Sequence, residues 1–279
     1  ETVKDLDPEC PSCHAVQTIA ARRYVEPQYG FVASETTRQG SSQAPRRSWS
    51  SVTYIVDSHA DVQEGTAVFP TGSEVSWRAG ARGQFVVINE GPGRAGFHLC
   101  QWCGWGSPVA QHAKVPKDHE HLLKGKDVRC TGPLVKFSLA HRYETDFVEL
   151  RLDQATALYH ARHLRSAVYA LLEGASTALE ISRDDIDGTV HHTADGGRSL
   201  VLFDTTPGGA GNTLRIAENL VDVVTTAVAR VARCECGEET SCYGCLRNFR
   251  NERYHEELSR RAALNLLGGF VPWRQEVLG

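Results

Sequence analysis

The first half of the chain carries short hydrophobic runs of the kind that form β-strands. These runs are rich in Val, Ile, Phe and Thr, they alternate with polar residues, and Gly or Pro bounds them. The pattern predicts strands at 51–57, 66–70, 74–79, 84–90 and 96–100. We therefore expect a β-rich module over residues 1–130.

The second half changes to a mixture of strand and helix patterns. Strands are expected at 134–140 and 143–152, and a more continuously apolar, buried strand at 199–205. Apolar residues spaced by three or four positions predict helices. The expected helices run over 155–181, from Asn212 to about Cys234, and from Tyr254 to Leu267. Residues 131–279 are thus expected to form an α/β domain, and the chain as a whole an α+β or mixed α/β fold.

Two polar stretches without apolar periodicity, 34–51 and 111–129, are expected to be loops.

The chain has 279 residues, of which 41% are hydrophobic and 23% charged, and this composition is that of a globular protein. No apolar run reaches the roughly 20 residues that a membrane span needs. The first residues lack the basic and apolar regions of a signal peptide. We therefore expect a cytoplasmic protein that does not enter a membrane.

Two features of the composition bear on the biological context. The sequence contains no methionine, even at position 1, which favours a piece of a longer polypeptide. The formal net charge is −4, so that any contact with nucleic acid must come from a local basic patch.

The cysteines are arranged in close pairs. Nine are present, an odd number in a chain without an export signal, which argues against a disulfide framework. Short pairs separated by long intervals are instead typical of metal sites. The pairs are Cys10/Cys13, Cys100/Cys103, Cys234/Cys236 and Cys242/Cys245, with Cys130 alone.

The last two pairs are the strongest candidate for a metal site. Cys234-x-Cys236-x5-Cys242-x2-Cys245 presents four thiolates on two short loops, which suits the tetrahedral coordination of Zn²⁺. Four thiolates close the coordination sphere and leave no position for a catalytic water. The sequence therefore predicts a structural zinc site at the end of the α/β domain.

A second zinc site is expected from Cys10, Cys13, Cys100 and Cys103. The β-rich module would be inserted between the two halves of this site, making it a zinc-knuckle module, and the chain would hold two zinc ions. The interval between the halves is wide, so that another ligand can replace one of these cysteines. The alternatives are His14, His98, His112, His119, His121 and Cys130.

An arginine row follows the last cysteine. Arg247, Arg250 and Arg253 fall on one face if this stretch is helical, and Tyr254 adjoins them. Basic and aromatic side chains together suit contacts with DNA phosphates and bases. A solvated face, on which the arginines pair with neighbouring glutamates, is the alternative.

The segment DTTPGGAG (204–211) joins a buried strand to a helix. Such a turn can hold a phosphate, or can simply let the helix pack closely on the strand. Nearby, Asp146, Glu173 and Asp204 raise the alternative of a Mg²⁺-dependent nuclease. Carboxylates in such positions more often cap helices or satisfy buried hydrogen bonds.

The C-terminal run, DTTPGGAG followed by CECGEETSCYGCLRNFRNERYH, resembles the MrfA-type zinc-binding domain. The stretch LAHRYETDF resembles a strand motif of that family, Gly-His-x-Phe-x-Thr-Asp. His141, Thr145 and Asp146 match the motif, whereas Ala140 and Tyr143 replace its Gly and Phe. The earlier stretches YVEPQYGF and FVVINEGPGRAGFHLCQWCG resemble the segment that precedes this domain in large bacterial DEAD/DEAH-box helicases.

The resemblance implies the C-terminal accessory module of a bacterial, ATP-dependent superfamily 2 DNA helicase or translocase. Relatives of this kind act in DNA repair and in DISARM-like antiviral defence. The family's zinc ligands would be Cys234, Cys236, Cys242 and Cys245, and the partners would be the helicase motor domains and DNA. No Walker A or DEAH-type motif occurs in the chain, so that we expect no ATPase activity from it. A protein-interaction scaffold without nucleic-acid contact is a further alternative.

Overall fold

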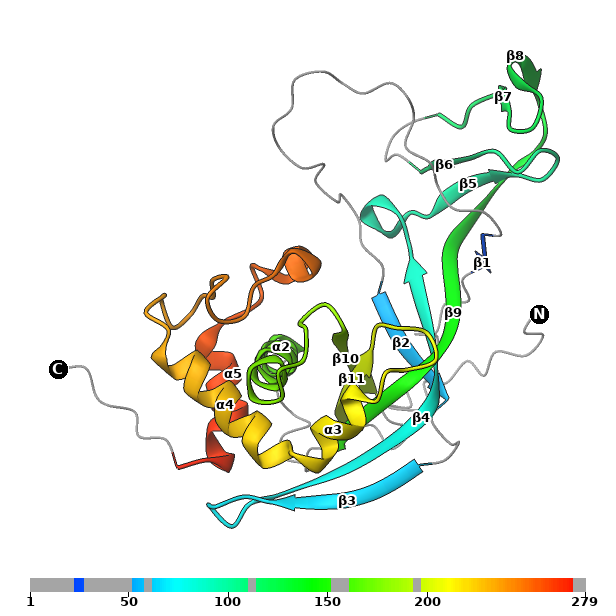
Figure 1. The fold of residues 1–279 in the computed structure, drawn as a ribbon. Helices are drawn as coiled ribbons and strands as arrows, with labels where there is room; N and C mark the ends of the chain where they lie inside the picture. Colours follow the sequence, from blue (N-terminus) through cyan, green and yellow to red (C-terminus); the bar gives the residue numbers. More distant parts are fainter. Residues whose placement is uncertain are drawn as a thin grey trace. The chain divides into compact units, whose positions relative to one another are not determined.

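The structure is a computed structural model that describes residues 23–27, 52–57, 62–109, 114–151, 161–192 and 197–272. The chain forms two compact units, each assembled from separate segments. The larger unit contains the described residues between 54 and 85 and between 143 and 272. The smaller unit contains 23–27, 52–53 and 86–142. Figure 1 shows the elements of both units.

One layer of the larger unit is a mostly antiparallel sheet, whose strands β2, β4 and β9 also contain residues of the smaller unit. Its strand order is β10-β11-β9-β4-β2, and β3 pairs with β4. The buried strand β11 pairs antiparallel with β9 on one side, Leu202 opposite Val148, and with β10 on the other. The bounds are β2 Val52–Asp57, β3 Val62–Val68, β4 Glu74–Asn89, β9 Leu134–Arg151, β10 Ile186–His192 and β11 Arg198–Asp204.

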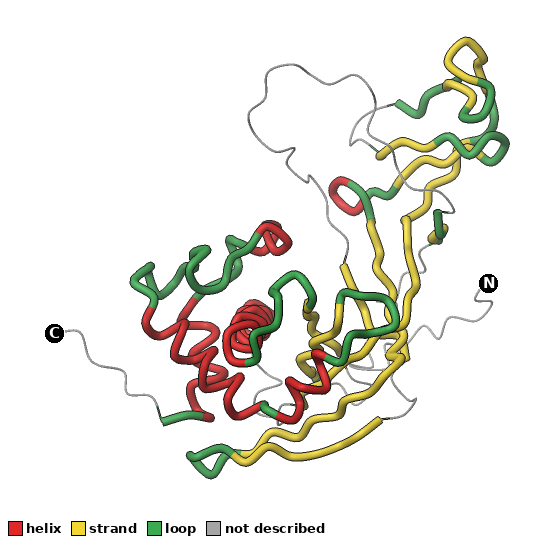
Figure 2. The backbone as a smooth tube through the Cα atoms, viewed as in Figure 1, coloured by secondary structure: helices red, strands yellow, loops and turns green. Residues whose placement is uncertain are grey.

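The helices of the larger unit lie together beside these strands (Figure 2). They are α2 Ala161–Ala178, α3 Asn212–Glu218, α4 Leu220–Arg233, η2 Phe249–Tyr254, α5 Arg260–Leu267 and η3 Gly268–Phe270. Helix α2 is buried on nearly every side because it packs on α4, α5, β10 and β11.

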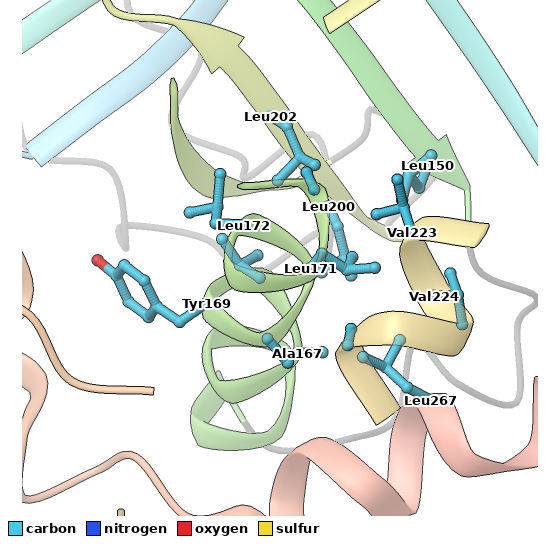
Figure 3. Packing of buried hydrophobic residues seen from close by; sticks show 14 of the residues in the cluster. Leu150, Ala167, Tyr169, Leu171, Leu172, Leu200, Leu202, Val223, Val224 and Leu267 are labelled. Atoms are coloured by element: carbon cyan, nitrogen blue, oxygen red, sulfur yellow. The ribbon is translucent and has the colours of Figure 1, made fainter. Parts of the chain in front are cut away.

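The core of the larger unit surrounds α2. In Figure 3, Leu171 and Leu172 of α2 lie among Leu150, Leu200 and Leu202 of the strands. Val223 and Val224 of α4 and Leu267 of α5 complete this packing. Gly174 lets α2 approach α4 closely, since a Cβ atom there would lie 2.4 Å from the carbonyl oxygen of Val223. The same core extends to Cys245 and Leu246, and so reaches the C-terminal cysteines.

Two pairs of expected strands are single strands in the structure. The strands expected at 74–79 and 84–90 form the 16-residue β4, and those expected at 134–140 and 143–152 form the 18-residue β9. The glycine-rich stretch around Arg82 looks like a break, but the chain continues as a strand with one residue at positive φ, Arg82 at 67°. The polar residues His141 and Arg142 remain extended because a strand tolerates exposed side chains on one face.

Three expected helices differ from the observed ones. The helix expected at 155–181 is α2 Ala161–Ala178, and its expected first residues lie outside the described part of the chain. The helix expected from Asn212 is divided at Asn219, whose backbone leaves helical geometry between α3 and α4. The helix expected at Tyr254–Leu267 is η2 followed by α5. This division follows from two caps, a capping box of Asn248 with Asn251 and the Ser259 hydroxyl, which accepts from the amide of Ala262.

The smaller unit is built from short strands. Strand β5, Phe97–Cys100, pairs antiparallel with the first half of β9 and with β6, Gly106–Pro108. Strand β1, Tyr24–Val25, pairs parallel with β9. Strands β7, His119–His121, and β8, Gly125–Cys130, form a separate antiparallel hairpin, whereas 111–129 had been expected to be a loop. The 3₁₀ turn η1 covers Pro92–Arg94.

The expected fold class is confirmed, because the chain combines a large, mostly antiparallel sheet with few helices and a cysteine cluster near its C-terminus. The division into domains at residue 130 stays a prediction, since the two compact units interleave segments from both halves. Among the described residues, no helix is long and apolar enough to cross a membrane. The expected loop at 34–51 lies outside the described residues.

Candidate metal centre

The C-terminal cysteine group consists of Cys234, Cys236, Cys242 and Cys245, whose sulfur atoms converge. Cys234 is the residue at which α4 ends, in an extended conformation that turns the chain away from the helix. A turn follows at 242–245, where the amides of Cys245 and Leu246 both donate to the carbonyl of Cys242 at 3.1 Å. Leu246 is fully buried in the core, so that it anchors this turn to the helices.

The sulfur positions suit a tetrahedral metal ion. Adjacent Sγ atoms are separated by 3.5 Å for Cys234–Cys236, 3.5 Å for Cys234–Cys242, 3.7 Å for Cys236–Cys245 and 3.9 Å for Cys242–Cys245. A tetrahedron with Zn–S bonds of about 2.3 Å places its sulfurs about 3.8 Å apart. The spacing is far longer than the roughly 2 Å of a disulfide, and all seven cysteines in the described residues are free. The four thiols therefore fit a single metal ion.

The protonation of these thiols depends on whether a cation is present. Burial raises the pKa of Cys245 and of Cys236. Burial also acts to raise the pKa of Cys242, but hydrogen bonding with Cys234 and with the amide of Gly244 outweighs it and lowers the pKa to about 7. Four such thiols cannot all ionise next to one another without a positive charge. A bound cation removes this conflict, because a coordinating thiol is deprotonated.

Arg260 connects the C-terminal cysteine group to two helices. It is the first residue of α5, and its buried guanidinium donates to the carbonyls of Val231 at 2.9 Å and Ala232 at 3.0 Å, both in the last turn of α4. It also donates to the carbonyl of Cys236. Carbonyls at a helix end lack partners within the helix, so that the guanidinium of Arg260 caps α4. It also positions residues 234–245, which carry the four cysteines and are called the metal loop below. The cysteine spacing gave no indication of this role.

The segment after the last cysteine is held by internal hydrogen bonds. The Asn251 side chain is buried and donates to the carbonyl of Leu246 at 2.8 Å. The Nε2 atom of His255 lies 2.9 Å from Oδ1 of Asn251. Arg247 donates to the hydroxyl of Ser241 at 3.0 Å and to the carbonyl of His255 at 3.1 Å. Arg247 thus stabilises the metal loop, and it does not extend freely into solvent.

Arg250 and Arg253 remain accessible on η2. Arg250 donates to the carbonyl of Asp184 at 2.9 Å and lies 3.4 Å from its carboxylate. The guanidinium of Arg253 lies 4.3 Å from the ring centroid of Tyr254, and that of Arg165 lies 3.9 Å from the same centroid. The two arginines are three residues apart in η2, and the backbone of Asn251 between them departs from helical geometry, with φ −102° and ψ 16°.

The loop 204–211 uses its backbone amides internally. The buried carboxylate of Asp204 accepts from Ala210 at 2.6 Å, Asn212 at 3.1 Å and Thr213 at 3.1 Å. Asp146 accepts from Gly211 at 2.9 Å, and a Cβ atom at Gly209 would lie about 2 Å from its carboxyl group. The chain's own carboxylates thus occupy the position at the start of α3 that a phosphate would need. The structure favours the packing role of this loop.

The three carboxylates of the nuclease alternative have other partners. Glu173 forms ion pairs with Arg183 and Arg230, each at 3.1 Å. Asp146 and Asp204 bind backbone amides, and burial raises the pKa of Asp204. Among the residues that the structure describes, these three do not form a group able to hold a metal ion.

A second group of ligand-type residues lies in the smaller unit. Cys100 and Cys103 lie together with His119 and Cys130, and all four are buried. The group combines two cysteines of the expected set, Cys100 and Cys103, with two of the alternative ligands, His119 and Cys130. Cys10, Cys13, His14 and His112 lie outside the described residues. The described alternatives His98 and His121 do not belong to the group.

His119 and Cys130 were only alternatives in the sequence because their context looked like a loop. They are direct partners in the register of the β7–β8 hairpin, which brings them side by side. A hairpin that pairs these two residues could have been predicted from the alternation His119-x-His121, a turn with a glycine, and the alternation Val128-x-Cys130. Lysine and histidine around the turn obscured this alternation.

The C-terminal cysteine group falls inside a known family model. Residues 167–246 match the model of the MrfA Zn-binding domain. The chain is also 28% identical over 221 residues to Druantia protein DruE from Escherichia coli (strain UMEA 4076-1), a match that covers 68% of this chain. The chain spans only 12% of that relative's length.

Solved structures of a DUF1998 helicase, MrfA, are also similar. The structure of MrfA bound to DNA matches with a TM-score of 0.44 and 13% identity over 79% of this chain and 25% of that one. MrfA bound to DNA and AMPPNP matches with a TM-score of 0.34 and 12% identity over 78% of this chain and 22% of that one. This chain therefore corresponds in length to a minor part of each relative.

Proposed function

Because residues 167–246 are an MrfA-type zinc-binding domain, we propose that this chain is the zinc-binding accessory module of an ATP-dependent superfamily 2 DNA helicase or translocase. The observation that carries the proposal is the convergence of four thiols at tetrahedral spacing within the matched segment. The motor domains would lie elsewhere in the same polypeptide or complex. The module itself binds DNA and does not hydrolyse ATP.

Zinc is the proposed metal of the C-terminal cysteine group. Four sulfur donors in a closed tetrahedron favour Zn²⁺ over ions that prefer oxygen ligands. The four thiolates would hold the ion and leave no position for water, so that its role is structural. In this place the metal would supplement the hydrophobic core, to which Leu246 and Leu258 anchor a turn-rich segment.

The proposed DNA contact is the η2 face, which consists of Tyr243, Phe249, Arg250 and Arg253. Phe249 is 84% exposed and Tyr243 56% exposed, and their ring centroids are 5.5 Å apart. Exposed aromatic rings beside arginines suit stacking on bases and neutralisation of phosphates. The ion pair of Arg250 with Asp184 does not oppose this role, because Asp184 is 79% exposed and such surface pairs contribute little.

Fluorescence polarisation with labelled single-stranded and duplex DNA tests this contact. Phe249→Ala should weaken binding about 10-fold through lost stacking. The double variant Arg250→Ala/Arg253→Ala should weaken binding and lower the dependence of log Kd on log salt by about two, one for each phosphate contact. Arg151→Ala, which removes one exposed arginine from β9, is the matched control and should leave binding nearly unchanged.

The same experiment separates the alternatives. If the wild-type chain binds no DNA even at low salt, the η2 face does not contact nucleic acid, and docking on a motor domain or a scaffold role replaces the proposal. Equal affinities for the wild type and all variants would place the DNA contact on another surface. Retained zinc in every variant confirms that the C-terminal cysteine group is intact in the comparison.

A further inference from the structure

The β7–β8 hairpin and the turn after β5 bring four buried ligand-type residues to one point. We call Cys100, Cys103, His119 and Cys130 the hairpin group. Their ligand atoms lie within 4.8 Å of one another, and each residue is 6% exposed or less. We propose that the hairpin group is a second structural zinc site, with three thiolates and one imidazole as ligands. This site lies outside the segment that matches the family model.

The distances fit a tetrahedron with mixed ligands. The Sγ atoms of Cys100 and Cys130 are 3.8 Å apart, and Sγ of Cys103 lies 3.4 Å from Nε2 of His119. Zn–S bonds of about 2.3 Å and a Zn–N bond of about 2.0 Å give separations of about 3.8 and 3.5 Å. Both observed values agree with one central ion. The Cys100–Cys130 spacing excludes a disulfide.

The backbone around the hairpin group is arranged as in a metal knuckle. The amides of Trp102 and Gly132 donate to the sulfurs of Cys100 and Cys130, each at 3.4 Å. Amide donors of this kind stabilise thiolates. Gly132 has no room for a side chain, since a Cβ atom there would lie 2.7 Å from Sγ of Cys100. The chain around Gly132 therefore approaches Cys100 as closely as two loops that share one metal ion require.

Trp105 orients the imidazole ligand. The ring of His119 stacks on that of Trp105, with centroids 4.7 Å apart and planes 24° from parallel. This contact fixes the plane of the imidazole while Nε2 is directed at Cys103. A ligand whose orientation is set by a neighbouring side chain loses little freedom when it binds the ion.

The need for a metal follows from the small size of the packed region. The hairpin is a two-stranded sheet of its own, and an isolated hairpin is marginally stable. The buried cluster beside it consists of the three cysteines, with Trp105 and Leu134 packed against them. The ligands thus make up most of this small core. A zinc ion supplies the cohesion that the few apolar contacts lack.

Zinc content per chain, measured by elemental analysis, tests the ligand set. The wild type should hold two zinc ions, and His119→Ala and Cys130→Ser should each hold one. His121→Ala, two residues along the same hairpin, and the double variant Cys10→Ser/Cys13→Ser are matched controls that should keep two. Loss of an ion in Cys10→Ser/Cys13→Ser, or two ions in His119→Ala, would overturn the proposal.

Cobalt substitution gives a readout that a folding defect cannot imitate. His119→Cys should keep two metal ions and strengthen the sulfur-to-cobalt charge-transfer band, because one site changes from three thiolates to four. An unchanged band would show that His119 is not a ligand.

The tests of the hairpin group and of the proposed function have separate readouts. Zinc content tests the hairpin group, and Cys242→Ser should remove only the ion of the C-terminal cysteine group. DNA binding, which tests the proposed function, is measured separately.

Discussion

The guanidinium of Arg260 donates a hydrogen bond to the backbone carbonyl of Val231 at 2.9 Å, which joins the first residue of α5 to the last turn of α4. Since the same side chain also binds the carbonyl of Cys236, one arginine connects two helices to the metal loop. This contact makes the packing of the C-terminal helices depend on the geometry of the metal site.

Arg260→Ala should therefore destabilise the chain by about 3 kcal/mol, because it leaves carbonyls at a helix end buried without a partner. Arg261→Ala is the matched control. The neighbouring Arg261 is exposed and forms ion pairs with the exposed Glu238 and Glu239, so that its removal should change stability little. Urea unfolding of both variants checks the prediction, and equal stabilities would contradict it.

Gly174→Ala should destabilise the larger unit by about 1–3 kcal/mol, because the added methyl group would lie 2.7 Å from Cβ of Ala227 as well as against the carbonyl of Val223. Gly269→Ala serves as the control, since a Cβ atom at Gly269 meets nothing within 4 Å. Thermal unfolding should show a lower midpoint for the first variant alone. A similar midpoint for both would show that α2 and α4 are less closely packed.

Asp204→Ala should lower the free energy of unfolding by about 2–4 kcal/mol, since three backbone amides at the start of α3 lose their acceptor. In a plasmid-nicking assay with Mg²⁺ or Mn²⁺, the wild-type chain should show no cleavage above the metal-only background. Cleavage by the wild type that Asp204→Ala abolishes at a temperature where the variant is folded would restore the nuclease alternative.

Asp187→Asn should change how stability depends on pH. Burial raises the pKa of Asp187 above the ordinary 3.8, although the Gly188 amide and nearby arginines, led by Arg183, act to lower it. A raised carboxyl pKa contributes stability that is fully present below pH 3.8 and is lost as the pH rises through the folded-state pKa. The asparagine has no such dependence.

The variant should consequently gain stability relative to the wild type as the pH rises. Comparing the two proteins at each pH cancels effects that they share, including proton competition for the thiolates. A stability difference that is constant with pH, or that favours the wild type more as the pH rises, would contradict a raised pKa for Asp187.

Much of the architecture could be predicted from local pattern. Strand β11 and the apolar stripes of α2 and α4 are visible because burial on several sides demands apolar residues at regular spacing. The end of α5 at Leu267 was predicted, but its start was missed, since Ser259 caps the helix within a stretch that otherwise has helical periodicity. Strand β10 was missed because an edge strand with residues such as Asp187 and Gly188 lacks an apolar pattern.

The metal sites show the same division between local and distant information. Cys234 to Cys245 are neighbours in sequence, so that their spacing alone predicts the group. His119 and Cys130 meet Cys100 and Cys103 only through the hairpin register, which their separation in sequence does not reveal. The role of Arg260 could not be predicted, because a buried side chain that caps another helix leaves no local pattern in the sequence.

The central claim is that a zinc ion in the C-terminal cysteine group holds the segment 234–258 in place. Hydrogen exchange of the zinc-loaded chain and of the chain stripped by a chelator tests it most directly. We predict that removal of zinc makes the amides of 234–258 exchange rapidly, while those of the buried helix α2 keep most of their protection. Unchanged protection of 234–258 after complete removal of zinc would contradict the account.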